Sequence, residues 1–134
     1  MIVDDVMTTS VATVREDDAL SDALERFRIG GLRHVVVVDG DGRFAGLLND
    51  RLAVEYFGHD PRALRCTRVR DTVFDRRTSV AVGTPVVVAT KEILRHSAGA
   101  LAVVDENLAV VGVITGADLL RSFAKEIERE PSDT

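Results

Sequence analysis

Two pairs of polar residues have the types and spacing that suit the recognition of a small ligand. Thr115 and Asp118 stand three residues apart at the expected start of a helix. A carboxylate accepts hydrogen bonds from two hydroxyl groups, and a helix N-terminus is a favourable place for a phosphate. Arg33 and His34 are adjacent; the guanidinium offers a fork of donors for phosphate oxygens, and the imidazole adds charge below its ordinary pKa of about 6.5. These residue types could bind hydroxyl and phosphate groups.

The same residues also have a purely structural interpretation. Thr115 at the N-cap and Asp118 at the third helical position would satisfy free backbone amides and favour the helix dipole. Asn49 is an equally good N-cap in the first half of the chain. Arg33 and His34 follow an expected helix end, where cations are favourable. Capping and ligand binding are compatible, so both interpretations stay open.

The sequence offers little chemistry for catalysis or for a metal. His34, His59 and His96 share no metal-ligand spacing, and no Gly-x-Ser-x-Gly motif is present. Cys66 is the single cysteine, so it forms no internal disulfide and belongs to no zinc pattern. We expect Cys66 to be inert packing, and we expect no catalytic residues, no metal site and no required cofactor.

Length and composition indicate one acidic globular unit. The 134 residues are 46% hydrophobic and 29% charged, which is typical of a single compact domain. The longest apolar run, Leu108–Ile114, is far shorter than the roughly 18 residues of a membrane span. No basic region followed by an apolar segment opens the chain, so we expect a cytoplasmic protein.

The charge distribution makes nucleic acid an unlikely partner. The formal net charge of −5 argues against a general attraction to nucleic-acid phosphates. Arginines cluster between residues 62 and 77, but Phe74 is the only aromatic residue there that could stack on a base. We expect this cluster to be a solvated face or a subunit contact.

The chain contains an internal repeat, in which residues recur 66 positions later. Val3, Asp5, Val14, Ala23, Val37, Val38, Asp39, Gly46 and Phe57 recur as Val69, Asp71, Val80, Ala89, Val103, Val104, Asp105, Gly112 and Phe123. The apolar pattern recurs alongside these identities. We therefore divide the chain into a first repeat with its connector, 1–66, and a second repeat with a polar tail, 67–134.

Each repeat predicts the element order β-α-β-β-α. The first repeat predicts a strand over Val11–Val14, a helix capped by Asp17 and Asp18 and ended by Gly30 and Gly31, strands over His34–Val38 and Phe44–Leu48, and a helix from about Asp50 to Phe57. The second predicts strands near Thr78–Val82, Ala100–Val104 and Leu108–Ile114, a helix from Pro85 to about His96, and a helix from about Gly116. The connector lies around Gly58–Arg68, and the tail from Arg129 is expected to fray.

These repeats resemble a tandem pair of CBS domains, also called a Bateman module. The resemblance rests on Arg33–Asp39 with Gly46–Arg51, and on Leu101–Asp105 with Gly112–Asp118. It implies an α+β fold in which two repeats pack about a pseudo-twofold axis and leave two related clefts. Such clefts commonly bind adenine nucleotides or related adenosyl ligands, and each draws on both repeats.

Carried onto this sequence, the resemblance implies one complete cleft. Asp118 would hold the ribose, Thr115 would bond the ribose-phosphate edge, and Val113 would lie against the base. Leu32, Arg33 and His34 would reach the phosphates, while Ser10 and Ala12 would line the adenine pocket. The other cleft has Asn49 and Leu52 in place of Thr115 and Asp118, and Gly99 and Ala100 in place of Arg33 and His34. We expect that cleft to be degenerate, with Arg76 leaving open a weak phosphate contact.

The resemblance also implies a regulatory protein rather than an enzyme. The expected function is a stand-alone sensor that binds AMP, ADP, ATP or S-adenosylmethionine and acts on a separate, unidentified protein. The alternative is a dimerisation or protein-interaction module whose clefts stay empty. Family members form homodimers through the helices of both repeats, and Leu119, Leu120, Phe123 and Ile127 provide spare apolar surface for this.

Overall fold

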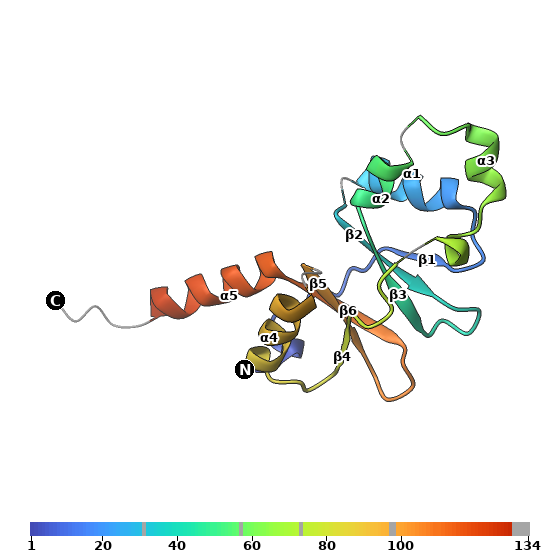
Figure 1. Cartoon of the computed structure of the whole chain (residues 1–134). Coiled ribbons are helices and arrows are strands. Elements are labelled where there is room, and N and C mark those ends of the chain that lie inside the picture. The colour runs from blue at the N-terminus through green and yellow to red at the C-terminus, as the bar shows by residue number, and fades with distance from the viewer. Residues whose placement is uncertain (31, 57, 73, 97–98, 130–134) are drawn as a thin grey trace.

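The computed structural model describes residues 1–30, 32–56, 58–72, 74–96 and 99–129. It confirms the α+β class and the repeated β-α-β-β-α order, with two three-stranded sheets ordered β1-β2-β3 and β4-β5-β6 (Figure 1). The first repeat contains β1 (Thr13–Arg15), α1 (Leu20–Gly30), β2 (His34–Val38), β3 (Phe44–Asn49) and α2 (Arg51–Glu55). The second contains β4 (Ser79–Ala81), α4 (Val86–His96), β5 (Ala100–Val104), β6 (Val110–Thr115) and α5 (Gly116–Arg129). The predicted helix ends at Gly31 and Phe57, and the tail beyond Arg129, lie outside the described residues.

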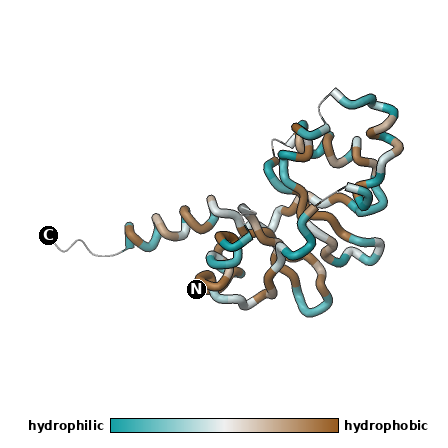
Figure 2. The backbone as a smooth tube through the Cα atoms, in the orientation of Figure 1, coloured by the Kyte–Doolittle hydropathy of each residue, from teal (hydrophilic) through white to brown (hydrophobic). Residues whose placement is uncertain are grey.

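The two sheets repeat each other in register. In each, the first strand pairs parallel to the second and the second pairs antiparallel to the third, with a register shift at Val37/Val38 and again at Val103/Val104. Parallel pairing needs a crossover connection, which α1 and α4 provide. The central strands are rich in valine because they are covered on both faces. Figure 2 shows the hydrophobic colouring along the strands and the hydrophilic colouring at the hairpin turns.

A carboxylate closes each hairpin turn. Asp39 Oδ1 accepts the backbone N–H groups of Asp41 and Arg43 at 2.8 and 2.9 Å, and Asp105 does the same in the second hairpin. The first turn contains Gly42 with a positive φ of 79°, and the second has Leu108 with a φ of 65° at the equivalent position. A non-glycine residue in the left-handed region is unfavourable, so the second turn is the more strained of the two.

The leading segment of each repeat packs against the other repeat. These segments form the short 3₁₀ turns η1 (Val3–Asp5) and η2 (Val69–Asp71). Four backbone hydrogen bonds of 2.7 to 3.0 Å hold them, from Val3 to Thr84, Val86 to Met1, Val69 to Asp18 and Leu20 to Thr67. Val3 is fully buried in the core of the second repeat, and Val69 in that of the first. The two repeats therefore complete each other's cores.

This exchange also corrects two local predictions. The first helix begins at Leu20, so Asp17 and Asp18 do not cap it; the Leu20 N–H bonds the Thr67 carbonyl, and the Asp18 carboxylate accepts the N–H of Arg15 at 2.8 Å. The second correction concerns the connector, for which no helix was predicted. It contains a short helix, α3 (Pro61–Cys66), whose N-cap Asp60 accepts the N–H of Arg62 at 3.0 Å.

Cys66 is exposed at the end of α3, so the expectation that it packs inertly is wrong. Helix α3 packs beside α1 in the first repeat, whereas α5 extends away from both sheets (Figure 1). None of the helices in the described ranges is long and apolar enough to cross a membrane.

The two sheets pack against each other through a small apolar interface. Val36, Leu47, Ala100 and Ala102 are buried there together. Two of the four are alanines, so the backbones of the two sheets approach closely with little side-chain bulk between them. Two cavities adjoin this interface, and residues of both repeats line each of them; Val36 lines one and Leu47 the other.

Candidate functional site

One of these cavities, of about 580 Å³, contains most of the residues that the sequence singled out; we call it the first cleft. Seven of the eight predicted residues line it, namely Ser10, Ala12, Leu32, Arg33, His34, Val113 and Thr115. The remaining lining residues are Thr8, Val11, Val36, Gly99, Gly116 and Ala117. The structure thus brings together side chains up to 105 positions apart in the sequence, between Ser10 and Thr115. Asp118 is the exception, because it does not line this cavity.

The segment that precedes β1 connects the two walls of the first cleft. Thr8 and Val113 exchange two backbone hydrogen bonds, of 2.8 and 2.9 Å, which place this segment along β6 of the second repeat. Four residues later the Ala12 carbonyl accepts the N–H of Val36 at 3.0 Å, which ties the segment to β2 of the first repeat. Ser10 lies between these two anchors, so its place at the cleft follows from backbone pairing on both sides.

Arg33 is the cationic group of the first cleft that is open to solvent. Its backbone is fixed because its carbonyl accepts the N–H of Asp50 at 2.9 Å, while its side chain is exposed. Within the described ranges, no carboxylate oxygen lies within 4.0 Å of its guanidinium. An arginine that pairs with no protein carboxylate keeps its donors for an anionic ligand.

The imidazole of His34 lies against the opposite repeat. Its Nε2 is 3.5 Å from the point where a Cβ at Gly99 would lie, and Gly99 has a positive φ of 75°. The Gly99 carbonyl in turn accepts the N–H of Gly116, the first residue of α5, at 3.1 Å. Glycine is favoured here by its backbone conformation, whereas a Cβ would make only an ordinary contact with the imidazole. In the alignment of the two repeats Gly99 is the counterpart of Arg33, and this alignment did not predict that Gly99 contacts His34.

Asp118 is buried at the start of α5, with only 6% of its surface exposed. Its Oδ2 accepts the N–H and the hydroxyl of Thr115 at 2.9 and 3.1 Å, and the Thr115 Oγ1 accepts the N–H of Asp118 at 3.2 Å. This reciprocal pattern is a capping box, which confirms the structural interpretation of the two residues. These hydrogen bonds concern helix capping alone and do not test the predicted contacts of Thr115 and Asp118 with a ligand.

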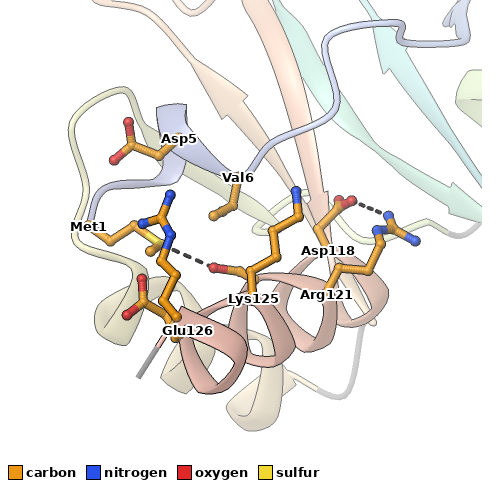
Figure 3. A pocket seen from close by; sticks show the side chains of 9 residues that line it. Met1, Asp5, Val6, Asp118, Arg121, Lys125 and Glu126 are labelled. Carbon is orange, nitrogen blue, oxygen red and sulfur yellow. Dashed lines mark hydrogen bonds and ion pairs between the residues drawn. The ribbon is translucent and has the colours of Figure 1, made fainter. Parts of the chain in front are cut away.

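The second carboxylate oxygen of Asp118 connects three parts of the chain. Asp118 Oδ1 accepts the hydroxyl of Thr8 at 3.2 Å and the guanidinium of Arg121 at 2.6 Å. Figure 3 shows Asp118 and Arg121 in contact at one end of a neighbouring pocket of about 540 Å³, into which Lys125 also points. Asp118 faces this pocket, while its partners Thr8 and Thr115 line the first cleft. Thr8 is therefore a site residue that sequence reasoning missed, and no motif in the sequence marked it.

The other of the two cavities between the repeats has a volume of about 700 Å³, and we call it the second cleft. Asn49 and Leu52 line it, as does Arg76. Leu52 is 5% exposed and packs in the core of the first repeat, and the side-chain carbonyl of Asn49 accepts the N–H of Arg51 at 3.0 Å. Among the residues that the structure describes, no group of three or more His, Cys, Asp or Glu side chains could hold a metal ion.

A family model described as "CBS domain" matches residues 3–58 and again residues 69–125. Among curated proteins, the chain is 31% identical over 119 residues to a homoserine O-acetyltransferase of Methanococcoides burtonii. That alignment covers 89% of this chain but 23% of the relative, so the chain spans about a quarter of that protein's length.

Two solved structures share the fold and contain ligands. The first, CBSX2 in complex with AMP, is 24% identical with a TM-score of 0.79, and the match covers 96% of this chain and 98% of that one. The second, the CBS domain pair of protein MJ0100 in complex with 5-methylthioadenosine and S-adenosyl-L-methionine, is 17% identical with a TM-score of 0.78 and coverage of 94% and 98%. At these identities the likeness concerns the fold.

Proposed function

Because this chain belongs to the CBS-domain family, we propose that it is a regulatory module that binds an adenosine-containing ligand in the first cleft. The candidate ligands are AMP, ADP, ATP and S-adenosylmethionine. The observation that carries the proposal is that one cavity gathers seven of the eight expected residues from both repeats, including an arginine that pairs with none of the described carboxylates. CBS domain pairs of the same fold bind AMP, or 5-methylthioadenosine and S-adenosylmethionine.

The lining of the first cleft supports a definite orientation for the ligand. Val113 and Ala12 offer an apolar surface to the adenine, while Arg33 and His34 lie at the side suited to phosphates or another charged group. The Thr115 hydroxyl lies at the expected ribose edge; it donates to Asp118 Oδ2 and accepts the Asp118 N–H, so it offers a ligand its remaining acceptor lone pair. For Asp118 to accept ribose hydroxyls, it must give up one of its present donors, and Thr8 and Arg121 are the candidates because both bond Oδ1.

This exchange suggests how binding is transmitted. A ligand that contacts Arg33 in the first repeat and Thr115 in the second bridges the two repeats. If it also takes the place of Thr8 or Arg121 on Asp118, it changes the contact between the N-terminal segment and α5. A ligand shifts a conformational equilibrium only through such differential contacts, so the surface of α5 is where a separate regulated protein would detect binding.

Calorimetric titration of the four ligands tests the proposal. We expect one of them to bind saturably, and Arg33→Ala to weaken that binding by about tenfold or more, because a charge-assisted hydrogen bond is lost. The matched control is Arg62→Ala, an exposed arginine on α3 away from both clefts, which we expect to bind like the wild type. Failure of all four ligands to bind the folded wild type would favour the alternative, a protein-interaction module with empty clefts.

We also propose that the module is a homodimer. Helix α5 leaves Leu120, Phe123 and Ile127 exposed by 71, 64 and 59%, and α4 adds the exposed Leu94 nearby. Large apolar side chains gathered on neighbouring helices mark an interaction surface. Sedimentation velocity should show a dimer at micromolar concentration, and Phe123→Glu should shift it toward monomer. A wild-type monomer at these concentrations would contradict this proposal.

A further inference from the structure

We propose that the second cleft binds a multiply charged phosphate oxyanion, of the size of pyrophosphate, without a nucleoside. Three arginines line this cavity: Arg51 at the start of α2, and Arg76 and Arg77 in the segment before β4. At the equivalent positions of the first cleft, 66 residues away, the chain has Ala117, Ser10 and Val11. The second cleft has therefore gained three guanidinium groups that the first one lacks.

These guanidinium groups form no ion pairs with the carboxylates that the structure describes. Within the described ranges, no carboxylate oxygen lies within 4.0 Å of any of them. Two acidic residues, Glu55 and Asp75, also line the cavity, but the Asp75 carboxylate accepts the backbone N–H of Arg77 at 2.8 Å instead of a guanidinium. Guanidinium groups that are not paired with carboxylates keep their donors, and one bound oxyanion can accept from several of them at once.

One of the three guanidinium groups is held in place. The Cζ atom of Arg76 lies 4.4 Å from the centroid of the Phe74 ring, a cation–π arrangement. Stacking on the ring restricts the side chain and leaves the guanidinium edge free to donate hydrogen bonds. An arginine ordered in this way loses less conformational entropy when a ligand binds.

The same cleft is poorly suited to a nucleoside. At the position equivalent to Asp118 it has Leu52, which packs in the core of the first repeat and presents no acceptor for ribose hydroxyls. At the position of Thr115 it has Asn49, whose carbonyl already accepts the N–H of Arg51. The cavity thus keeps a cationic surface while it has lost the ribose-binding groups. This inference uses residues that the first cleft does not contain, so it can hold or fail independently of the proposed adenosyl site.

Isothermal titration of sodium pyrophosphate into the whole chain tests the inference. We expect saturable binding by the wild type, and binding weakened by about tenfold or more in the double variant Arg76→Ala/Arg77→Ala, since charge-assisted bonds are lost. Both side chains are exposed, so the variant should keep the thermal stability of the wild type; if it does not fold, Arg51→Ala provides the same test. Arg62→Ala is the control and should bind pyrophosphate as the wild type does.

Three results would overturn the inference. The first is no pyrophosphate binding by the folded wild type at low ionic strength, where screening is weak. The second is binding that Arg33→Ala removes and the Arg76/Arg77 variant preserves, which would place the anion in the first cleft. The third is competition by free adenosine for pyrophosphate binding, which would show that the second cleft accepts a nucleoside. A protein that binds pyrophosphate but no adenosyl ligand would support this inference and contradict the proposed function.

Discussion

Asp118→Ala should destabilise the protein even when no ligand is present. The carboxylate is buried and accepts four hydrogen bonds, two from Thr115, one from Thr8 and one from Arg121. Alanine removes all four, so α5 loses the Asp118 half of its capping box and Thr8 loses its bond to the helix, while the N-cap bond from the residue-118 N–H to Thr115 Oγ1 is kept. The structure therefore predicts a loss of stability that is separate from any loss of ligand binding.

The size of this effect follows from the partners. Loss of the Asp118 half of the capping box costs about 1 kcal/mol, the same order as loss of an N-cap residue, with a range of roughly 0.5 to 2. The ion pair adds only about 0.3 to 0.5 kcal/mol, because the Arg121 side chain is mostly exposed and water screens the interaction. The Thr8 hydroxyl is near the surface and can bond water instead, so its loss costs little. The sum is about 1.5 kcal/mol, which for a chain of this length lowers Tm by about 5 °C.

Chemical and thermal unfolding followed by circular dichroism measure this loss. Asp50→Ala is the matched control, because Asp50 is exposed, precedes α2 and makes no side-chain cap bond; its effect should stay within about 0.5 kcal/mol. Asp118→Asn keeps one accepting oxygen, so it should fall between Asp118→Ala and the wild type. An Asp118→Ala protein as stable as the wild type, or one no less stable than the Asp50 variant, would refute the assignment of the capping box.

Three further predictions concern the fold. Gly46→Ala should destabilise by about 1 to 3 kcal/mol in denaturant unfolding, because a Cβ there would strike the Phe74 ring and lie 2.9 Å from the Asp75 carbonyl oxygen; a neutral substitution would contradict the close crossing. Leu108→Gly should raise Tm by a few degrees, since relief of the left-handed backbone, about 1 to 2 kcal/mol, exceeds the cost of added freedom in the unfolded chain; a lower Tm would count against strain in this turn. The backbone hydrogen bond from Arg43 holds the pKa of Asp39 below its ordinary value, so its stabilisation is present above the unfolded pKa and is lost as pH falls through the folded one. Asp39→Asn should therefore cost stability at pH 7 and progressively less below about pH 4, and an NMR titration midpoint at or above the ordinary value would disprove it.

Local patterns in the sequence were enough to predict both sheets. The valine run at 35–38 and the apolar run at 101–104 lie in buried central strands, as their composition predicts, and the offset of 66 places matching elements in each repeat. The hairpin turns follow from Asp39 and Asp105, because an aspartate can bond the backbone two residues on. Period and turn chemistry are local properties, so a single sequence reveals them.

Long-range packing was not visible in the same way. Val3 and Val69 recur as a pair, but nothing local shows that each completes the core of the other repeat. The missing cap of α1 has the same origin, because the Thr67 carbonyl, 47 positions after Leu20, takes the place of a local side chain. Helix α3 was missed although Asp60 and Pro61 carry its starting signal, since the segment is short and has no apolar stripe.

The sequence predicted which residue types form the candidate site, but it did not predict the hydrogen bonds between them. The repeat and the family pattern identified Arg33, His34, Thr115 and Asp118, of which the first three line one cavity. The bond between Asp118 and Thr8 was unpredictable because it joins residues 110 positions apart and depends on the crossing of the N-terminal segment over β6. The burial of Leu52 gives a physical reason for the predicted lack of a ribose contact in the second cleft, because its side chain belongs to the core.

The most direct test of the central claim is to observe where an adenosyl ligand binds. Backbone amide resonances of the isotopically labelled chain would be followed by NMR during titration with AMP, ADP, ATP and S-adenosylmethionine. The account predicts saturable shifts at Ala12, His34 and Thr115, which belong to both repeats, and little change at Asn49 in the second cleft. Shifts confined to one repeat or to the second cleft, or no shifts with any of the four ligands, would contradict it.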